Sequence, residues 1–192
     1  LFFVLFILFL PIYGLLGLSK RTATLRIIYV VLFSLFFYYK SSGFYVLLLL
    51  LATTSDFLIA QALSHTPKGS PNRKRWVALS MIINLGILSY FKYFNFLADL
   101  VVQAIAGIGG LMGMETASSL QWEPWDIFLP VGISFYTFQT MSYIADVYRG
   151  DIKPLKRWID YLFYVSFFPQ LVAGPIVRAK DFIPQIHRRP WV

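Results

Sequence analysis

The 192-residue sequence contains no cysteine, only two histidines and only nine acidic residues. Without cysteine, neither a disulfide framework nor a Cys/His metal site is available. Charged residues make up 14% of the chain, whereas soluble domains carry roughly 25%. In their place, 58% of the residues are hydrophobic and 19% are aromatic, and the mean hydropathy is +0.65. This composition predicts an integral membrane protein.

Six apolar runs approach the length of about 20 residues that a helix needs to cross a bilayer. They are Leu1–Leu18, Ile27–Tyr39, Phe44–Leu63, Trp76–Leu97, Ile127–Val147 and Tyr161–Val177. The second run is short, and we expect its helix to extend backward over Arg26, whose long side chain reaches the interface. The predicted fold class is all-α, a polytopic transmembrane helical bundle of about five spans plus a broken or re-entrant segment.

The net charge of +8 lies in short basic clusters between the apolar runs. A basic excess also occurs in nucleic-acid-binding proteins, but clusters between spans are typical of membrane orientation, because cytoplasmic loops are rich in lysine and arginine. The basic residues after the first, third and fifth runs are Lys20, Arg21, Arg26, Lys68, Arg73, Lys74, Arg75, Arg149, Lys153, Lys156 and Arg157. The pattern predicts that these loops are cytoplasmic, that lipid surrounds the chain, and that nucleic acid is no partner.

The sixth run, Tyr161–Val177, conflicts with this alternation, because basic residues follow it directly. A full crossing would place them outside. A re-entrant hairpin that turns at Pro169 or at Gly174-Pro175 would keep them in the cytoplasm, and we favour it over the crossing. Between the fourth and fifth runs, Ala98–Asp126 is expected to be a loop with tryptophans at the outer membrane interface.

Polar side chains lie at intervals of three and four within the fifth run, so they share one helical face. They are Tyr136, Gln139, Tyr143 and Asp146. Polar groups at membrane depth face protein or a water-filled cavity. The face therefore either lines a substrate passage or makes hydrogen bonds between helices. Asp146 also precedes Arg149 by three residues, a spacing that allows an ion pair.

Asp56 in the third run is an isolated carboxylate, and such a group costs roughly 2.5–3.5 kcal/mol at the centre of a spanning helix. It is expected to face the bundle and a polar partner. Asn84 and Lys92 of the fourth run are the candidate partners. Lys92 has the alternative of extending outward to the interface.

Two blocks carry a family resemblance: PVGISFYTFQ..SY..DVYRG within Leu129–Gly150, and SFFPQLVAGPIVRAKDF.PQ, which lies within Phe167–Ile186 except for Ser166 directly before it. They resemble the membrane-bound O-acyltransferase (MBOAT) family, in particular its bacterial branch that acetylates alginate. The resemblance implies a cell-envelope protein of the bacterial inner membrane. It would move an acyl group, most often acetyl, from acyl-CoA or another cytoplasmic thioester to a polysaccharide hydroxyl, with periplasmic or extracellular partner proteins. No bound cofactor is implied.

The resemblance also implies a catalytic histidine in a tryptophan-histidine context. Neither His65 nor His187 has that context, so no catalytic residue is assigned here. The chain starts at Leu1 inside an apolar run, without a basic segment before it. We therefore interpret residues 1–192 as the N-terminal portion of a single membrane domain whose catalytic part follows, and we expect this portion alone to be inactive.

In the second block, Gln170, Gly174, Pro175 and Arg178 match family positions. Arg178 is a candidate for gripping the phosphates of the acyl donor, because a guanidinium group suits phosphate. The alternative is a boundary arginine that binds lipid headgroups. Two rival functions also stay open: a non-catalytic transporter or channel fragment, and an inactive truncated remnant.

Overall fold

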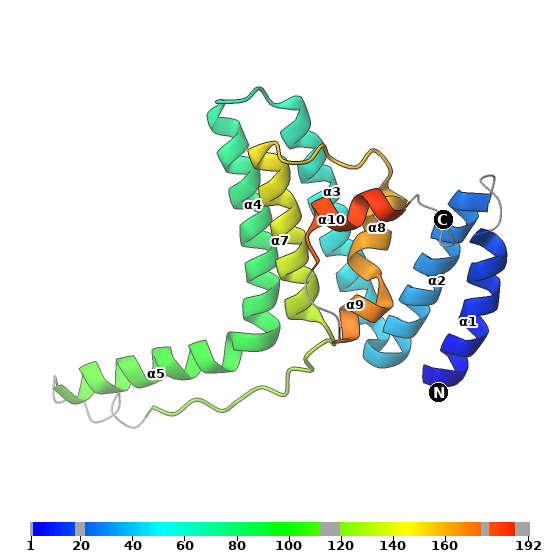
Figure 1. Cartoon of the computed structure of the whole chain (residues 1–192). Coiled ribbons are helices and arrows are strands. Elements are labelled where there is room, and N and C mark those ends of the chain that lie inside the picture. Colours follow the sequence, from blue (N-terminus) through cyan, green and yellow to red (C-terminus); the bar gives the residue numbers. More distant parts are fainter. Residues whose placement is uncertain (1, 18–21, 112–119, 174–176, 187–192) are drawn as a thin grey trace.

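The structure, a computed structural model, describes residues 2–17, 22–111, 120–173 and 177–186. Every regular element in these ranges is a helix (Figure 1). The elements are α1 (Phe2–Gly17), α2 (Ala23–Ser42), η2 (Gly43–Tyr45), α3 (Val46–His65), α4 (Pro71–Leu88), η3 (Ser89–Tyr93), α5 (Phe94–Leu111), α7 (Ile133–Arg149), α8 (Trp158–Ser166), α9 (Phe168–Ala173) and α10 (Ala179–Ile186). The predicted all-α class is confirmed.

Local sequence determines where the long helices begin and end. Gly43 takes a positive φ of 59° at the end of α2, a conformation open to glycine, and the chain reverses there into α3 (Figure 1),. The hydroxyl of Ser70 accepts a hydrogen bond from the Asn72 N–H and caps α4, whose first residue is Pro71,. These signals make α2, α3 and α4 a series of helices that run alternately up and down.

Helix α3 is central, because it packs against α4, α7 and α8. Its buried positions recur every three or four residues, as one face of a helix requires. They are Leu49, Ala52, Thr53, Asp56, Ile59, Ala60 and Leu63. The small side chains among them allow the neighbouring helices to approach closely.

Hydrogen bonds between distant segments gather the basic loops at one end of the bundle. Arg157 donates to Thr24 Oγ1 (3.3 Å) and joins the segment before α8 to the start of α2. Arg73 donates to the Tyr148 carbonyl (2.8 Å) and joins the start of α4 to the end of α7. We call this end, with Lys68, Arg73, Lys74, Arg75, Arg149, Lys153, Lys156 and Arg157, the basic end.

At the opposite end, which we call the far end, the Val131 N–H donates to Ser42 Oγ (3.1 Å), so the end of α2 meets the start of α7. Lys40, in the last turn of α2, and Lys92, in η3, are the basic residues near this end in the helices described there. The separation of basic from non-basic loops that the sequence predicts is therefore present in three dimensions.

The expected loop after Leu97 is wrong over its first part, because helix α5 continues to Leu111. Glycines in this stretch weaken a helix by up to about 1 kcal/mol each, but apolar residues at helical spacing outweigh them. Within the described part of this stretch, residues 120–132 are without helix, and they return along α5 to the start of α7 (Figure 1). Gly113, the second glycine of a GxxxG pattern that begins at Gly109, lies outside the described residues.

Two helical stretches among the described residues qualify by length and apolar composition as membrane spans: Ala23–His65 and Pro71–Leu111. Gly43 divides the first into two helices of 20 residues each. The five spans predicted from the sequence are not confirmed. Helix α2 does extend over Arg26, but this side chain is buried and donates to the Ile186 carbonyl (3.2 Å) instead of reaching outward.

The sixth run is broken, as predicted. Helix α8 ends at Ser166, and α9 brings the Leu171 carbonyl so close to Gly132 that a Cβ there would lie 2.8 Å from its oxygen. Beyond residues 174–176, Val177 is again beside α8, since its carbonyl accepts from the Tyr164 hydroxyl (3.1 Å). The described parts of the sixth run therefore reach the start of α7 and come back beside α8; a re-entrant course in the membrane stays a prediction.

Candidate functional site

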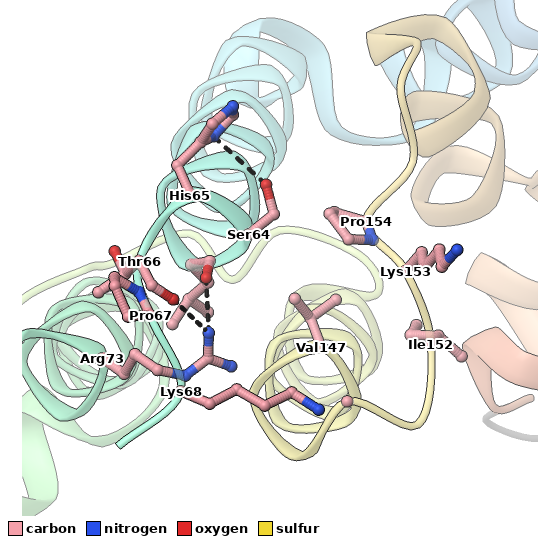
Figure 2. Close-up of a pocket in the computed structure, with 12 residues that line it drawn as sticks. Ser64, His65, Thr66, Pro67, Lys68, Arg73, Val147, Ile152, Lys153 and Pro154 are labelled. Atoms are coloured by element: carbon pink, nitrogen blue, oxygen red, sulfur yellow. Dashed lines mark hydrogen bonds between the residues drawn. The ribbon is translucent and has the colours of Figure 1, made fainter. Parts of the chain in front are cut away.

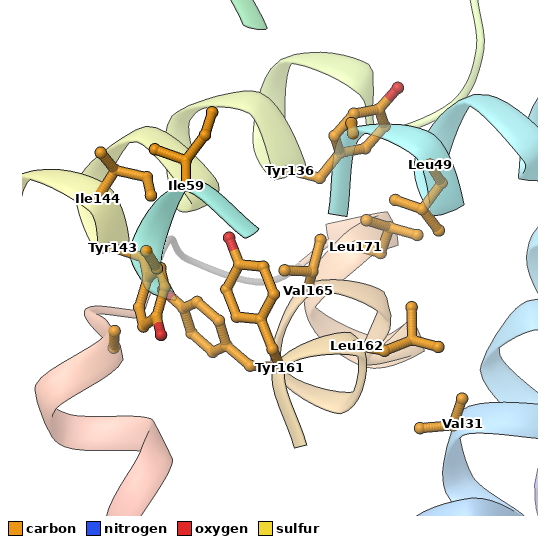
Figure 3. Close-up of a cluster of buried hydrophobic side chains, with 14 of the residues drawn as sticks. Val31, Leu49, Ile59, Tyr136, Tyr143, Ile144, Tyr161, Leu162, Val165 and Leu171 are labelled. Carbon is orange, nitrogen blue, oxygen red and sulfur yellow. The ribbon is translucent and has the colours of Figure 1, made fainter. Parts of the chain in front are cut away.

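The polar stripe of α7 is buried between α3, α4, α8 and α10. The exposed fraction is 0% for Tyr136 and Tyr143, 2% for Gln139 and 8% for Asp146. Figure 3 shows Tyr136 and Tyr143 pointing into the cluster of side chains at the centre of the bundle. The shared face predicted from their spacing is therefore the inner face of α7.

Two members of the stripe make hydrogen bonds to neighbouring segments. Gln139 Nε2 donates to the Tyr164 carbonyl (2.8 Å), which ties α7 to α8. The Tyr143 hydroxyl accepts from the Leu155 N–H (2.9 Å), and Gln61 Nε2 donates to the Leu155 carbonyl (2.6 Å). The Gln139 bond is interhelical, the alternative to a passage, whereas the Tyr143 bond joins α7 to the loop before α8. The passage itself stays a prediction.

Three tyrosine rings surround the middle of the stripe. Tyr143 and Tyr161 lie side by side (Figure 3), with ring centroids 4.5 Å apart. The ring of Tyr164 lies 6.4 Å from that of Tyr143 and 6.3 Å from that of Tyr161. The Tyr161 hydroxyl is buried without a hydrogen-bond partner in the described part of the chain. The sequence analysis missed Tyr161 and Tyr164, although their spacing of three residues was a usable signal for one helical face.

Asp146 is the anomalous member of the stripe. Its Oδ2 is buried and has no hydrogen-bond partner among the described residues. The expected ion pair with Arg149 is absent: the Arg149 side chain is exposed, and no salt bridge joins it to Asp146 in the described ranges. Spacing allowed the pair, but α7 turns Asp146 inward and Arg149 outward. A buried carboxylate without a cation is costly, so Asp146 is a candidate functional group.

Asp56 faces the bundle, as predicted. Its carboxylate accepts from Ser80 Oγ (2.5 Å) and from Asn84 Nδ2 (2.8 Å), and Thr140 Oγ1 donates to Asn84 Oδ1 (3.0 Å). The network joins α3, α4 and α7. Asn84 is therefore the predicted partner, whereas Lys92 is not: its ammonium extends outward to Ser134 Oγ (3.4 Å).

The second block is described only in part. Gln170 is buried, whereas Arg178 is exposed just before α10. Gly174, Pro175 and His187 lie outside the described residues. His65 is exposed at the end of α3 and contacts the Gln61 carbonyl through Nδ1 (2.7 Å), a local contact without a catalytic partner.

A cavity of about 420 Å³ opens at the basic end, one residue beyond Asp146. Its lining includes the ends of α3 and α7 and the loops that follow them: Leu63, Ser64, His65, Thr66, Pro67, Lys68, Arg73, Val147, Gly150, Ile152, Lys153 and Pro154 (Figure 2). Lys68 and Lys153 are exposed and form no ion pair within the described ranges. Arg73 is buried and donates to the Leu63 (2.6 Å) and Thr66 (3.0 Å) carbonyls. The cavity is thus lined by cations without a carboxylate.

The fold and this site define a class: an apolar helical protein of the membrane, with a polar stripe inside the bundle and a basic cavity beside its end. No family model matches the chain, and no solved structure matches it. Curated relatives do. The "probable alginate O-acetylase AlgI" of Pseudomonas aeruginosa is 41% identical over 116 residues, which cover 60% of this chain and 21% of the relative.

Two further relatives act on other polymers by name. The peptidoglycan O-acetyltransferase of Helicobacter pylori is 28% identical over 145 residues, which are 63% of this chain and 25% of the relative. The teichoic acid D-alanyltransferase of Lacticaseibacillus rhamnosus is 27% identical over 109 residues, or 54% and 27%. The predicted resemblance to bacterial membrane-bound O-acyltransferases is confirmed, and the chain is a homologue of part of these enzymes. It matches about a fifth of the length of its alginate O-acetylase relatives.

Proposed function

We propose that this chain is the N-terminal portion of a membrane O-acyltransferase that moves an acyl group, most simply acetyl, from a cytoplasmic thioester to a hydroxyl of a cell-envelope polysaccharide. The observation that carries the proposal is the similarity to alginate O-acetylases at 41% identity over 60% of the chain. The named relatives act on three different envelope polymers. The proposed acceptor is therefore a polysaccharide of the envelope, reached with periplasmic or extracellular partner proteins.

The proposed setting is the bacterial inner membrane, crossed several times. The distribution of charge supports it: the basic loops lie together, and the far end lacks such a cluster among the residues described there. Lysine and arginine accumulate in cytoplasmic loops. We therefore place the basic end in the cytoplasm, where acyl thioesters are made, and the far end outside, toward the acceptor.

The basic cavity is the proposed place for the phosphate-bearing part of the donor. Its volume of about 420 Å³ falls in the range of small-molecule sites,. Lys68 and Lys153 in its lining offer positive charge to phosphates, and Val147, the residue after Asp146, connects the lining to the polar stripe (Figure 2). The donor is acyl-CoA or another acyl thioester, and no bound cofactor is needed.

Within this proposal the chain contributes binding and passage rather than the proton transfer itself. Acyl transfer to a hydroxyl requires a base near the operating pH, usually histidine. His65 makes only local contacts. His187 lies outside the described residues, and the matched region covers about a fifth of the alginate O-acetylase relative; we propose that the base is a histidine of the remaining part of such an enzyme.

The proposal is tested on the full-length protein, expressed in a bacterium that lacks its own envelope acetylase. Ester-linked acetate on purified envelope polysaccharides is the readout. Acetate that depends on the protein supports the proposal; none on any envelope polymer, with the protein present in the membrane, overturns it. Movement of a solute without ester formation would favour the transporter alternative.

A matched pair of variants tests the donor site. The double change Lys68→Ala/Lys153→Ala is expected to raise the KM for the donor several-fold with kcat unchanged, because it removes phosphate contacts common to ground and transition states. Lys74→Ala is the control, since Lys74 is exposed at the same end but does not line the cavity. Equal KM and kcat values for the unchanged protein, the double variant and Lys74→Ala would show that the cavity does not bind the donor.

A further inference from the structure

Helix α5 extends from the bundle without a substantial packing partner among the described helices other than η3. The helical stretch Pro71–Leu111 has 41 residues. At a rise of 1.5 Å per residue it would measure about 62 Å if straight, twice the hydrocarbon core of about 30 Å. It is not straight: after α4, whose 18 residues span about 27 Å, the π-helical turn η3 redirects the chain sideways (Figure 1). Helix α4 alone is therefore close in length to the thickness of the hydrocarbon core.

The sequence of α5 is amphipathic. At 3.6 residues per turn, a continuous apolar stripe runs along one side. It consists of Leu97, Leu100, Val101, Ala104, Ile105, Ile108 and Leu111. The large side chains of the stripe are exposed, for example Leu100 at 54%, Val101 at 56% and Ile108 at 56%. The opposite side carries Asn95, Asp99 and Gln103.

The polar side already has its partners. Asn95 Nδ2 donates to the Trp125 carbonyl (2.8 Å), and the Trp125 N–H donates to Asn95 Oδ1 (2.9 Å). Gln103 Nε2 donates to Asp99 Oδ2 (2.7 Å). The Phe94 ring contacts the Trp125 ring at 4.9 Å. The return segment, residues 120–132, is thus held near the first turn of α5. The large side chains of the apolar stripe stay exposed.

Composition and position both indicate what covers this stripe. Helix α5 lies at the far end and is apolar apart from the few polar residues of its other side. It follows the exposed apolar surface of α4, where Ile82 is 69% exposed. The return segment adds Trp122 and Trp125, aromatic side chains that favour the headgroup level, beside Glu123 and Asp126,.

We propose that α5 and the return segment form an interfacial element that lies in the plane of the bilayer surface at the far end. The stripe from Leu97 to Leu111 would face the acyl chains of that leaflet, while Asn95, Asp99 and Gln103 face the headgroups and water. An amphipathic helix in this position sits about 5–10 Å into the boundary between headgroups and chains. The interfacial element would lie beside the far end of the polar stripe, where Tyr136 is the last residue of the stripe.

The experiment measures the depth of single spin labels in the full-length protein in lipid nanodiscs. The 192 residues contain no cysteine, so in a background without other cysteines each label reports one site. The apolar series is Leu100→Cys, Ile105→Cys and Ile108→Cys, and the polar series is Asp99→Cys and Gln103→Cys. Ile82→Cys on α4 calibrates the bilayer interior, and Lys153→Cys calibrates water.

Collision with oxygen marks lipid, and collision with a water-soluble nickel chelate marks water. We expect the apolar series to favour oxygen at one shared shallow depth and the polar series to favour the chelate by several-fold. Depths that change steadily along the apolar series would mean that α5 crosses the bilayer and would overturn the proposal. Exclusion of both reagents would mean that protein covers the stripe, and this result would overturn the proposal as well. Failure of Ile82→Cys to favour oxygen would instead contradict the membrane setting itself.

Discussion

The carboxylate of Asp56 on α3 accepts a hydrogen bond from Asn84 Nδ2 on α4 at 2.8 Å, deep inside the bundle. Asp56 is 0% exposed and Asn84 is 1% exposed. Ser80 supplies the second donor, so the buried carboxyl group is satisfied by neutral hydrogen bonds and not by a cation. Because an apolar surrounding offers no alternative partner, this network fixes the register of three helices more firmly than apolar contacts alone.

Replacing Asp56 with alanine is expected to destabilise the bundle. The change leaves the Ser80 hydroxyl buried without its acceptor, at about 1–3 kcal/mol, while Asn84 Nδ2 loses one acceptor and keeps the Ser80 carbonyl (3.0 Å). The measurement is the thermal unfolding midpoint of the full-length protein in detergent, followed by circular dichroism. Asp56→Asn keeps one acceptor and should lose less. Lys92→Ala, which removes an outward side chain, is the control; a loss as large as that of Asp56→Ala would contradict the assignment of Asn84 over Lys92.

Gly132→Ala is expected to separate the start of α7 from α9. Gly132 has a φ of 73°, and an added Cβ would lie 2.8 Å from the Leu171 carbonyl oxygen, a backbone atom that cannot rotate away. The loss of stability should exceed about 1 kcal/mol. Gly86→Ala is the matched control, because nothing lies within 4 Å of a Cβ there. It should raise stability by up to about 1 kcal/mol. A higher melting temperature for Gly132→Ala than for Gly86→Ala would contradict the close approach of Gly132 to the Leu171 carbonyl.

Arg178→Ala in the full-length protein is expected to lower acyl transfer several-fold without loss of expression. The side chain is exposed before α10, so its removal leaves the buried core intact. A guanidinium group matches phosphate, and its loss should weaken donor binding. Lys180→Ala, exposed two residues further on, controls for net charge. If transfer is unchanged in Arg178→Ala, this arginine contacts lipid headgroups or water and not the donor.

Sequence patterns predicted the features that depend on periodicity and charge. The inward face of α7 follows from spacing, because a helix places residues three and four apart on one side. The separation of basic loops follows from the clustering of lysine and arginine, and the inward orientation of Asp56 follows from the cost of a carboxylate at the centre of a span. The break near Pro169 follows from the loss of a backbone donor at proline.

The rest depended on contacts between segments far apart in the chain. Arg26 is buried because α10 brings the Ile186 carbonyl to it, 160 residues away in sequence. Lys92 was as plausible a partner of Asp56 as Asn84 until the rotation of α4 was known. The glycines after Ala104 indicated a loop, but apolar residues at helical spacing continue the helix to Leu111. The contact of Arg26 with α10 and the rotation of α4 depend on how the helices pack, which no local sequence pattern specifies.

Asp146→Asn is expected to make the protein more stable and less active. One oxygen of the Asp146 carboxylate is buried without a partner, and no described cation pairs with it, so the charged form costs free energy that the amide avoids. An increase of about 1–2 kcal/mol in unfolding free energy is the expected gain, measured as above. A group retained at such a cost is typical of functional sites. Lower ester formation by the more stable variant would place Asp146 in the substrate passage. Unchanged ester formation would make the stripe a set of helix contacts only, and Arg149→Gln, on the exposed side of α7, should change neither quantity.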